Sequence, residues 1–241
     1  MTPRHFGLFC IQGTGHILPM SAIGRALLAR GHRVSCFQNV RARALIRAAG
    51  LDWQPLGTAS AEIRKAPRAS ARPAAVFTPD LMRSHAASVL QDGCAAVQRA
   101  GVDALVVDQG DLAAGSVAER LGLPFVSVSF FPPLFLDAEV PPTIVGWGAG
   151  GGVLARLRNW AANRVLSRVL APTLRVVNTQ RRTWGLRPFA HLNECVSRRA
   201  LISQLPECLD FPRRRRPPQL HYTGPFLDAQ AATPSTSRGP L

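Results

Sequence analysis

Short apolar runs alternate with segments of helical periodicity in the first part of the chain. An apolar run at residues 5–11 leads into a glycine loop at 12–15, which is typical of a buried strand ending in a turn. Apolar residues then recur at helical spacing over 19–30, where Pro19 suits the first turn of a helix and Gly31 suits its C-cap. The alternation continues with a strand over 33–38, a helix over 40–49 and a strand over 51–56.

The same alternation returns after a long segment without periodicity. Residues 57–78 are rich in Ala, Arg, Ser and Pro, and predict a loop. The next helix is expected over 79–100, and its apolar face is Leu81, Ala86, Val89, Leu90 and Val97. Then follow a strand over 102–107 that ends at Asp108, a helix over 112–121, a strand over 124–129, an irregular stretch over 130–152, a helix from 153 to about 184 interrupted at Pro172, and short strands over 199–203 and 220–222.

This order of elements predicts an α/β fold: a Rossmann-like parallel sheet with helices on both faces. Residues 1–226 are expected to form that domain, because the Ala-, Thr-, Pro- and Ser-rich residues 227–241 are typical of a linker or tail. The chain has 241 residues, of which 46% are hydrophobic and 18% charged, which favours a globular protein over a disordered one.

The charge of the chain is strongly basic, with a formal net charge of +15. A nucleic-acid partner is nevertheless not expected, because basic residues lie throughout both ends of the sequence and no aromatic stacking motif accompanies them. The run at 213–216 precedes two prolines and is interpreted as a solvated turn. A basic surface would also favour peripheral contact with an anionic membrane.

Several common site types and locations are disfavoured. The five cysteines form no C-x-x-C pair, which argues against a disulfide framework or a zinc site. No uncharged run reaches the roughly 20 apolar residues of a spanning helix, and the N-terminus lacks a signal-peptide core. We expect a cytoplasmic protein, peripheral at most to the inner face of the membrane, without a metal.

The glycine loop does not match the nucleotide-binding motifs. A dinucleotide fingerprint needs a third Gly or Ala where this chain has Leu18, and an acidic residue after the second strand, which here ends in Phe37-Gln38-Asn39. The P-loop pattern is absent as well. The chemistry of this loop is therefore expected to come from a side chain, and His16 is the first candidate.

His16 stands at a strand end, in a glycine loop and at the start of a helix. The partial positive charge of a helix N-terminus disfavours the imidazolium, so a neutral imidazole there suits a general base. Such a base needs a carboxylate that orients the ring, and Asp108 ends a strand expected beside the first. Because no G-x-S-x-G motif supplies a serine, the substrate's own hydroxyl is the expected nucleophile.

A structural role is the alternative for both residues. A histidine in a loop is commonly structural or solvated, and an aspartate at a strand end is commonly a helix N-cap. Asp111 offers a second candidate for that cap, which leaves Asp108 less well explained by capping.

A family pattern extends over nearly the whole chain. It lies in residues 15–20, 28–34, 103–108, 118–127, 201–207, 209–212 and 222–225. In order and spacing these segments resemble the N-terminal, acceptor-binding domain of bacterial UDP-dependent glycosyltransferases of the two-domain GT-B fold. Within that family they are most similar to the carotenoid (zeaxanthin) glucosyltransferases and their macrolide-glycosylating relatives.

The resemblance implies a hexosyl transfer from a UDP-sugar to a hydroxyl of a hydrophobic, carotenoid-like acceptor, with inversion and without a metal or other cofactor. His16 would be the general base and Asp108 its carboxylate partner. Residues 129–135 follow the fifth strand, where the family lines its acceptor pocket; ordinary core packing is the alternative for their aromatic side chains. The residues expected to contact the acceptor are Gly15, Ile17, Phe130, Phe131 and Phe135.

The donor signature of the family, which lies in a second domain, has no counterpart in the sequence. The expectation is therefore an acceptor-binding half-enzyme whose C-terminal donor-binding domain is absent, with a separate donor-domain chain as a possible partner. Whether such a half is active alone stays open. The alternative is a non-catalytic module that binds a hydrophobic ligand or a partner chain.

Overall fold

The computed structural model describes residues 2–57, 79–148, 150–214 and 216–227. Most of the loop expected over 57–78 and most of the tail expected over 227–241 lie outside the described residues. The domain boundary near residue 226 therefore stays a prediction.

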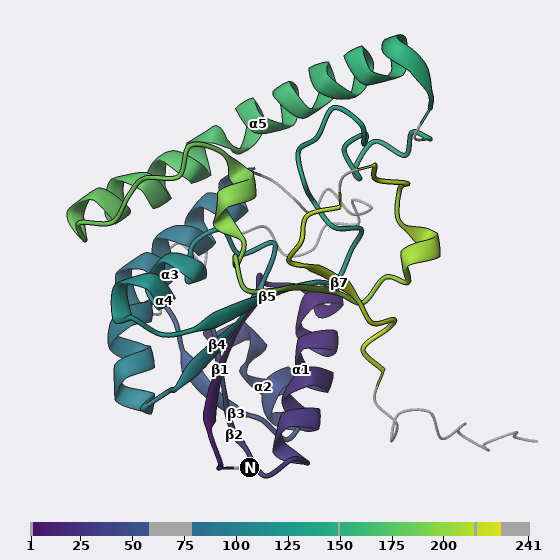
Figure 1. Cartoon of the computed structure of the whole chain (residues 1–241). Coiled ribbons are helices and arrows are strands. Elements are labelled where there is room, and N and C mark those ends of the chain that lie inside the picture. Colours follow the sequence, from purple (N-terminus) through teal and green to yellow (C-terminus); the bar gives the residue numbers. More distant parts are fainter. Residues whose placement is uncertain (1, 58–78, 149, 215, 228–241) are drawn as a thin grey trace, which may run out of the picture.

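A single parallel sheet organises the described part of the chain (Figure 1). Its strand order is β3-β2-β1-β4-β5-β6-β7. The strands are β1 (His5–Phe9), β2 (Arg33–Gln38), β3 (Asp52–Pro55), β4 (Ala104–Asp108), β5 (Phe125–Ser129), β6 (Leu201–Ser203) and β7 (Leu220–Tyr222). The α-helices are α1 (Thr14–Leu28), α2 (Arg43–Ala48), α3 (Pro79–Ala100), α4 (Ala114–Leu121) and α5 (Gly152–Thr183). Short 3-10 turns lie at Val40–Ala42, Leu192–Cys195 and Glu207–Leu209.

Helices cover both faces of the sheet, as predicted. On one face α1 and α2 bury apolar side chains such as Met20 and Ile46 against β1 and β2. On the other face α3 and α4 pack on the sheet through residues such as Val89 and Val117, and α5 lies over α3 (Figure 1). Parallel strands buried on both faces are expected to be almost continuously apolar, which β1 and β4 are.

The strand order positions the site. The chain builds the sheet outward from β1 to β3, then returns to the other side of β1 and continues from β4 to β7. The direction of winding therefore switches between β1 and β4, and ligands of open α/β sheets bind at the carboxyl ends of the strands at such a point. His16 follows β1 and Asp108 ends β4, so both lie at this switch point.

The prediction that Pro19 lies in the first helical turn is wrong. The helix begins five residues earlier, at Thr14, and Pro19 lies inside it. The Gly13 backbone, at φ +148°, turns the chain so that its carbonyl accepts the N–H groups of His16 and Ile17 and starts the helix there. Because proline has no N–H, the helix gives up one internal hydrogen bond at Pro19.

Two further expectations for the helices are corrected. The α5 helix continues through Pro172 without interruption, because buried Leu170 and Thr173 hold it on both sides of the proline. In α3, Leu81 is exposed and the buried face begins at Met82 instead. The other elements match the prediction within a few residues, although the helix expected over 40–49 is a 3-10 turn followed by the short α2.

Arg213 is not part of a solvated turn, as the sequence had suggested. Its side chain is 4% exposed and forms an ion pair with Asp210, whose carboxylate also accepts the Tyr222 hydroxyl. A second guanidinium N–H donates to the Pro133 carbonyl. Arg213 therefore ties the segment after β5 to the end of the domain, while Arg214 and Arg216 are exposed.

Candidate active site

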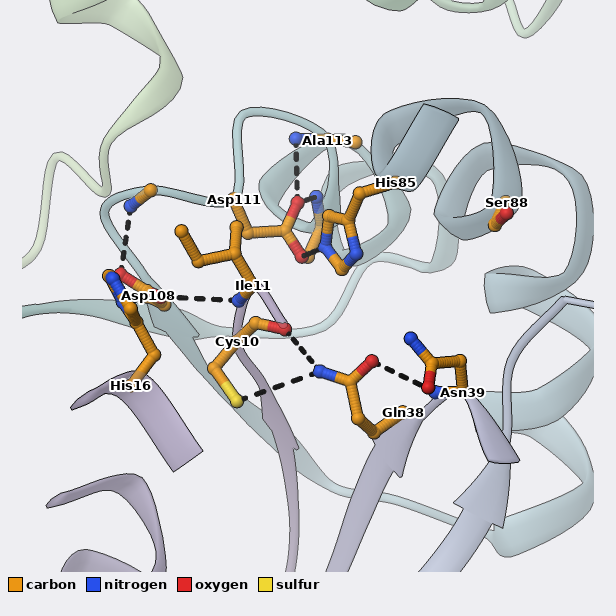
Figure 2. A network of polar contacts seen from close by, with 12 residues as sticks. Cys10, Ile11, His16, Gln38, Asn39, His85, Ser88, Asp108, Asp111 and Ala113 are labelled. Atoms are coloured by element: carbon orange, nitrogen blue, oxygen red, sulfur yellow. Dashed lines mark hydrogen bonds and ion pairs between the residues drawn. The ribbon is translucent and has the colours of Figure 1, made fainter. Parts of the chain in front are cut away.

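His16 and Asp108 form a direct pair at the switch point of the sheet (Figure 2). Nδ1 of His16, in the first turn of α1, lies 2.7 Å from Oδ2 of Asp108, at the end of β4. The Asp108 side chain is fully buried and that of His16 is 14% exposed. The pairing expected from neighbouring strands is therefore present, while the catalytic role of the two residues stays a prediction.

Asp108 is fixed by the backbone around it. Its Oδ1 accepts the N–H of Gly110 at 2.8 Å, and its Oδ2 accepts the N–H of Ile11 at 3.2 Å as well as His16. A carboxylate that accepts several backbone N–H groups cannot rotate freely. These contacts of Asp108 do not involve α4, whose N-cap residue is Ala113. Asp111 instead accepts the N–H groups of Ala113 and Ala114, where that helix begins.

The geometry defines what His16 can do. A carboxylate only accepts hydrogen bonds, so Nδ1 of His16 carries the hydrogen that it donates to Asp108. In the neutral ring the lone pair is then on Nε2, and a proton taken there produces an imidazolium beside the Asp108 carboxylate. This is the arrangement of an oriented general base.

Two phenylalanines from the segment after β5 lie against the ring of His16. The centroids of Phe130 and Phe131 are 5.8 and 5.9 Å from that of His16, both in edge-on orientation. Phe226 in turn lies edge-on to Phe130, at 6.0 Å. The candidate base therefore has an aromatic wall, which suits an apolar ligand and limits access of water to the ring.

Polar side chains fix the backbone of this wall. Gln204 donates to the Phe130 carbonyl and Ser129 to the Phe131 carbonyl, both at 2.7 Å. Gln109, directly after Asp108, both donates to the Leu134 carbonyl and accepts the Leu134 N–H. The wall and the carboxylate are thus joined through one buried glutamine.

We expect Gln109→Ala to loosen the aromatic wall. The change leaves the N–H and the carbonyl of Leu134 without the glutamine, at a cost of about 1 to 3 kcal/mol in the free energy of unfolding. Acceptor affinity should fall more than turnover does, because Asp108 keeps its own contacts. Denaturant unfolding and acceptor binding by fluorescence measure the two effects. The exposed Gln98→Ala is the matched control, and an equal loss in both variants would contradict this role.

The other residues expected to contact an acceptor have different environments. A Cβ added to Gly15 would meet nothing within 4 Å, so the first turn of α1 beside His16 borders open space. Ile17 is 3% exposed and packs in the core between α1 and the sheet. Phe135 packs with Val196, Leu201 and Leu220 below Arg213, in a separate apolar cluster. The structure therefore brings Phe130 and Phe131 to His16, but neither Ile17 nor Phe135.

A second His–Asp pair joins α3 to the loop after β4 and was not found from the sequence. Nε2 of His85, on α3, is 3.0 Å from Oδ2 of Asp111. Figure 2 shows the two pairs with Ile11 between them. The spacing of His85 from Met82 and Val89 places it on the buried face of α3, which is a signal that the sequence contains. Its partner follows only from the packing of α3 on the β4–α4 loop.

The pKa of His85 is raised above its ordinary value of 6.5. Burial by itself lowers the pKa, but the negative charge of Asp111 and its hydrogen bond to the ring outweigh burial, and the charge of Asp108 adds to the effect. A histidine whose pKa is higher in the folded state stabilises the fold below its unfolded pKa. That stabilisation is lost as the pH rises through the folded pKa.

We therefore expect His85→Gln to destabilise the protein more in acid than in base. The difference in the free energy of unfolding should be about 1.5 to 3 kcal/mol near pH 6, because a hydrogen bond to a charged partner is lost, and smaller near about pH 9. Urea unfolding of both proteins at each pH measures it. A difference that is constant across this range would show that folding does not raise the pKa of His85.

Neither a metal cluster nor a spanning helix is found among the described residues. No three His, Cys, Asp or Glu side chains come together there in a way that could hold a metal ion. No helix in the described ranges is both long and apolar enough to cross a membrane.

Solved structures with this architecture define a class of protein. A kitacinnamycin glycosyltransferase superposes with a TM-score of 0.69 at 19% identity, over 99% of this chain and 56% of that one. The calicheamicin glycosyltransferase CalG4 gives 0.63 at 16% identity, over 93% and 52%. The fold is that of one half of GT-B glycosyltransferases.

Sequence comparison finds relatives among bacterial glycosyltransferases of known activity. The chain is 30% identical to a zeaxanthin glucosyltransferase of Pantoea ananas over 240 residues, which is 97% of this chain and 56% of the relative. It is 26% identical to 4'-demethylrebeccamycin synthase of Lentzea aerocolonigenes over 230 residues. No protein-family model matches the chain. The chain is similar over nearly its whole length to these bacterial glycosyltransferases, and it spans about half the length of the curated relatives that it matches.

Proposed function

We propose that this chain is the acceptor-binding half of a glycosyltransferase that moves a hexose from a UDP-sugar to a hydroxyl group of an apolar acceptor. The observation that carries the proposal is the 2.7 Å contact of His16 with the buried Asp108, at the strand switch point and beside an aromatic wall. The similarity to zeaxanthin glucosyltransferases supports the same chemistry.

In this proposal His16 is the general base. Its Nε2 takes the proton of the acceptor hydroxyl while the hydroxyl oxygen forms a bond to the anomeric carbon. The bond from that carbon to the diphosphate breaks, and UDP leaves with the electron pair. A single displacement inverts the anomeric centre. Asp108 holds the ring in place and stabilises the imidazolium as it forms.

The chemistry of the wall supports an apolar acceptor. Phe130 and Phe131 present ring edges to His16, and the open space beside Gly15 leaves room next to the base. A rigid apolar molecule with a terminal hydroxyl fits this combination, because its body can pack on the rings while the hydroxyl reaches Nε2. Zeaxanthin, the acceptor named for two relatives, has these properties.

The donor is proposed to bind mainly outside this chain, since the similarity covers about half of each relative. A nucleotide sugar would then be held by a second domain or a second polypeptide, and no further cofactor or metal is needed for the displacement. Alone, the chain would bind the acceptor without turning it over.

The test separates binding from transfer. The chain is incubated with labelled UDP-glucose and hydroxylated apolar acceptors, zeaxanthin included, first alone and then with the C-terminal half of the Pantoea ananas relative. We expect acceptor binding in both cases and transfer only in the second. Transfer by the chain alone would show a donor site on this half. Acceptor binding without transfer in either case would favour a non-catalytic binding module, and no binding would reject the proposal.

A further inference from the structure

The N-terminal turns of α5 carry an exposed apolar surface that the candidate active site does not use. Val153, Leu154, Leu157 and Trp160, named here the α5 tip, are 80%, 82%, 59% and 53% exposed. In Figure 1 this end of α5 extends past the body of the domain, whereas the other end lies over α3. Contiguous exposed apolar side chains of this kind mark an interaction site.

The charge of the same helix is entirely of one sign. Its 32 residues include seven arginines and no aspartate or glutamate. Arg181 is buried; the six exposed arginines are Arg156, Arg158, Arg164, Arg168, Arg175 and Arg182. A helix with only positive charges on its exposed surface favours a negatively charged partner.

The apolar tip and the arginines lie on the same side of the helix. Residues 153, 157, 160, 164 and 168 follow one another at helical spacing of three or four, so they form one stripe. The opposite side, with Asn159, Leu166 and Leu170, is buried against the domain. The stripe is thus apolar at residues 153, 157 and 160 and basic at residues 164 and 168, nearer the part of α5 that lies over α3.

The loop before α5 extends the apolar end. Trp147 is 40% exposed, with the guanidinium of Arg158 5.1 Å from its ring centroid, and Ile144 is 70% exposed. Tryptophan and arginine in this combination are typical of segments that lie at the interface between lipid and water.

We infer that α5 binds the surface of a lipid bilayer that contains anionic lipids. Its tip would insert between the acyl chains, while the arginines along the stripe pair with lipid phosphates. Charge complementarity selects this partner: a second copy would bring two arginine-rich helices together, and a nucleic acid would give the leucines and the tryptophan no apolar contact. The inference stands without the proposed function, because it uses no residue of the His16 site.

Vesicle co-sedimentation tests the inference directly. The full chain is mixed with vesicles of phosphatidylcholine alone or with added phosphatidylglycerol, at low and high salt. We expect binding to the anionic vesicles only, weakened by salt. No binding to anionic vesicles, or equal binding to both kinds, would overturn the inference.

Paired variants locate the contact. Leu154→Glu with Leu157→Glu alters the tip, and Arg164→Glu with Arg168→Glu alters the stripe; each pair should weaken vesicle binding by about tenfold or more. Arg47→Glu with Arg99→Glu makes the same charge change on exposed residues of α2 and α3, and should bind as the original chain does. Circular dichroism confirms that each variant is folded.

Four other results would overturn the inference. Equal loss in the control pair would mean a diffuse charge effect. Unchanged vesicle binding in the tip pair would place the contact elsewhere. A dimer in ultracentrifugation that the tip pair dissociates, without any effect on vesicles, would assign the tip to a second copy of the chain. Retention on DNA that requires the stripe, without vesicle binding, would assign it to nucleic acid.

Discussion

Replacing His16 by alanine should reduce sugar transfer by about 10²- to 10⁴-fold, the usual contribution of a positioned general base. The loss should appear in turnover, because in the proposed function the acceptor would pack mainly on the aromatic wall and not on the imidazole. The fold should survive the loss of the His16 ring, which is 14% exposed. The Asp108 carboxylate stays hydrogen-bonded in the variant, because it still accepts the N–H groups of Ile11 and Gly110.

The measurement uses the chain together with a donor half, with kcat and KM determined separately. His221→Ala, an exposed histidine on β7, is the matched control and should leave both constants unchanged. A His16→Ala protein that still transfers sugar at the original rate would contradict the assignment of the base, although it would leave acceptor binding untouched.

The α/β fold and its layers were predictable because the signals are local. A buried parallel strand is an apolar run, and each helix here carries an apolar face and an end marked by glycine, as at Gly31 and Gly122. Pro19 and Pro172 misled the prediction for one shared reason. Proline weakens a helix locally, but buried neighbours and an early helix start outweigh the single hydrogen bond that it removes.

Only the part of the site that lies at strand ends could be predicted from the sequence. His16 and Asp108 follow from the rule that chemistry lies at the carboxyl ends of parallel strands. The residues of the aromatic wall could not be predicted in this way. Phe130 and Phe135 lie in one irregular segment, and nothing in their spacing tells which of them faces His16. Their orientations depend on distant partners, Gln204 for the first and Arg213 for the second. Contacts over such sequence separations are set by packing.

Asp108→Asn should also slow sugar transfer, by about 10²- to 10⁴-fold, while changing the shape of the site little. The amide is nearly isosteric but neutral, so it can hold the ring of His16 only through one oxygen and cannot stabilise the imidazolium. Asn also offers one acceptor oxygen where the carboxylate serves Gly110, Ile11 and His16 from two. Some loss of stability is therefore expected, about 1 to 3 kcal/mol.

Asp108→Ala separates the electrostatic effect from the structural one. It leaves two buried backbone N–H groups without an acceptor, so the free energy of unfolding should fall by about 2 to 6 kcal/mol in total, well beyond the Asn variant. If Asp108 acts on the base, the Asn variant loses turnover although it stays folded at the assay temperature. Combining Asp108→Asn with His16→Ala should then reduce turnover little further than His16→Ala alone, because both changes disable the same catalytic pair. Fully additive losses would mean that the carboxylate acts apart from the histidine, and that the buried 2.7 Å contact serves the fold alone.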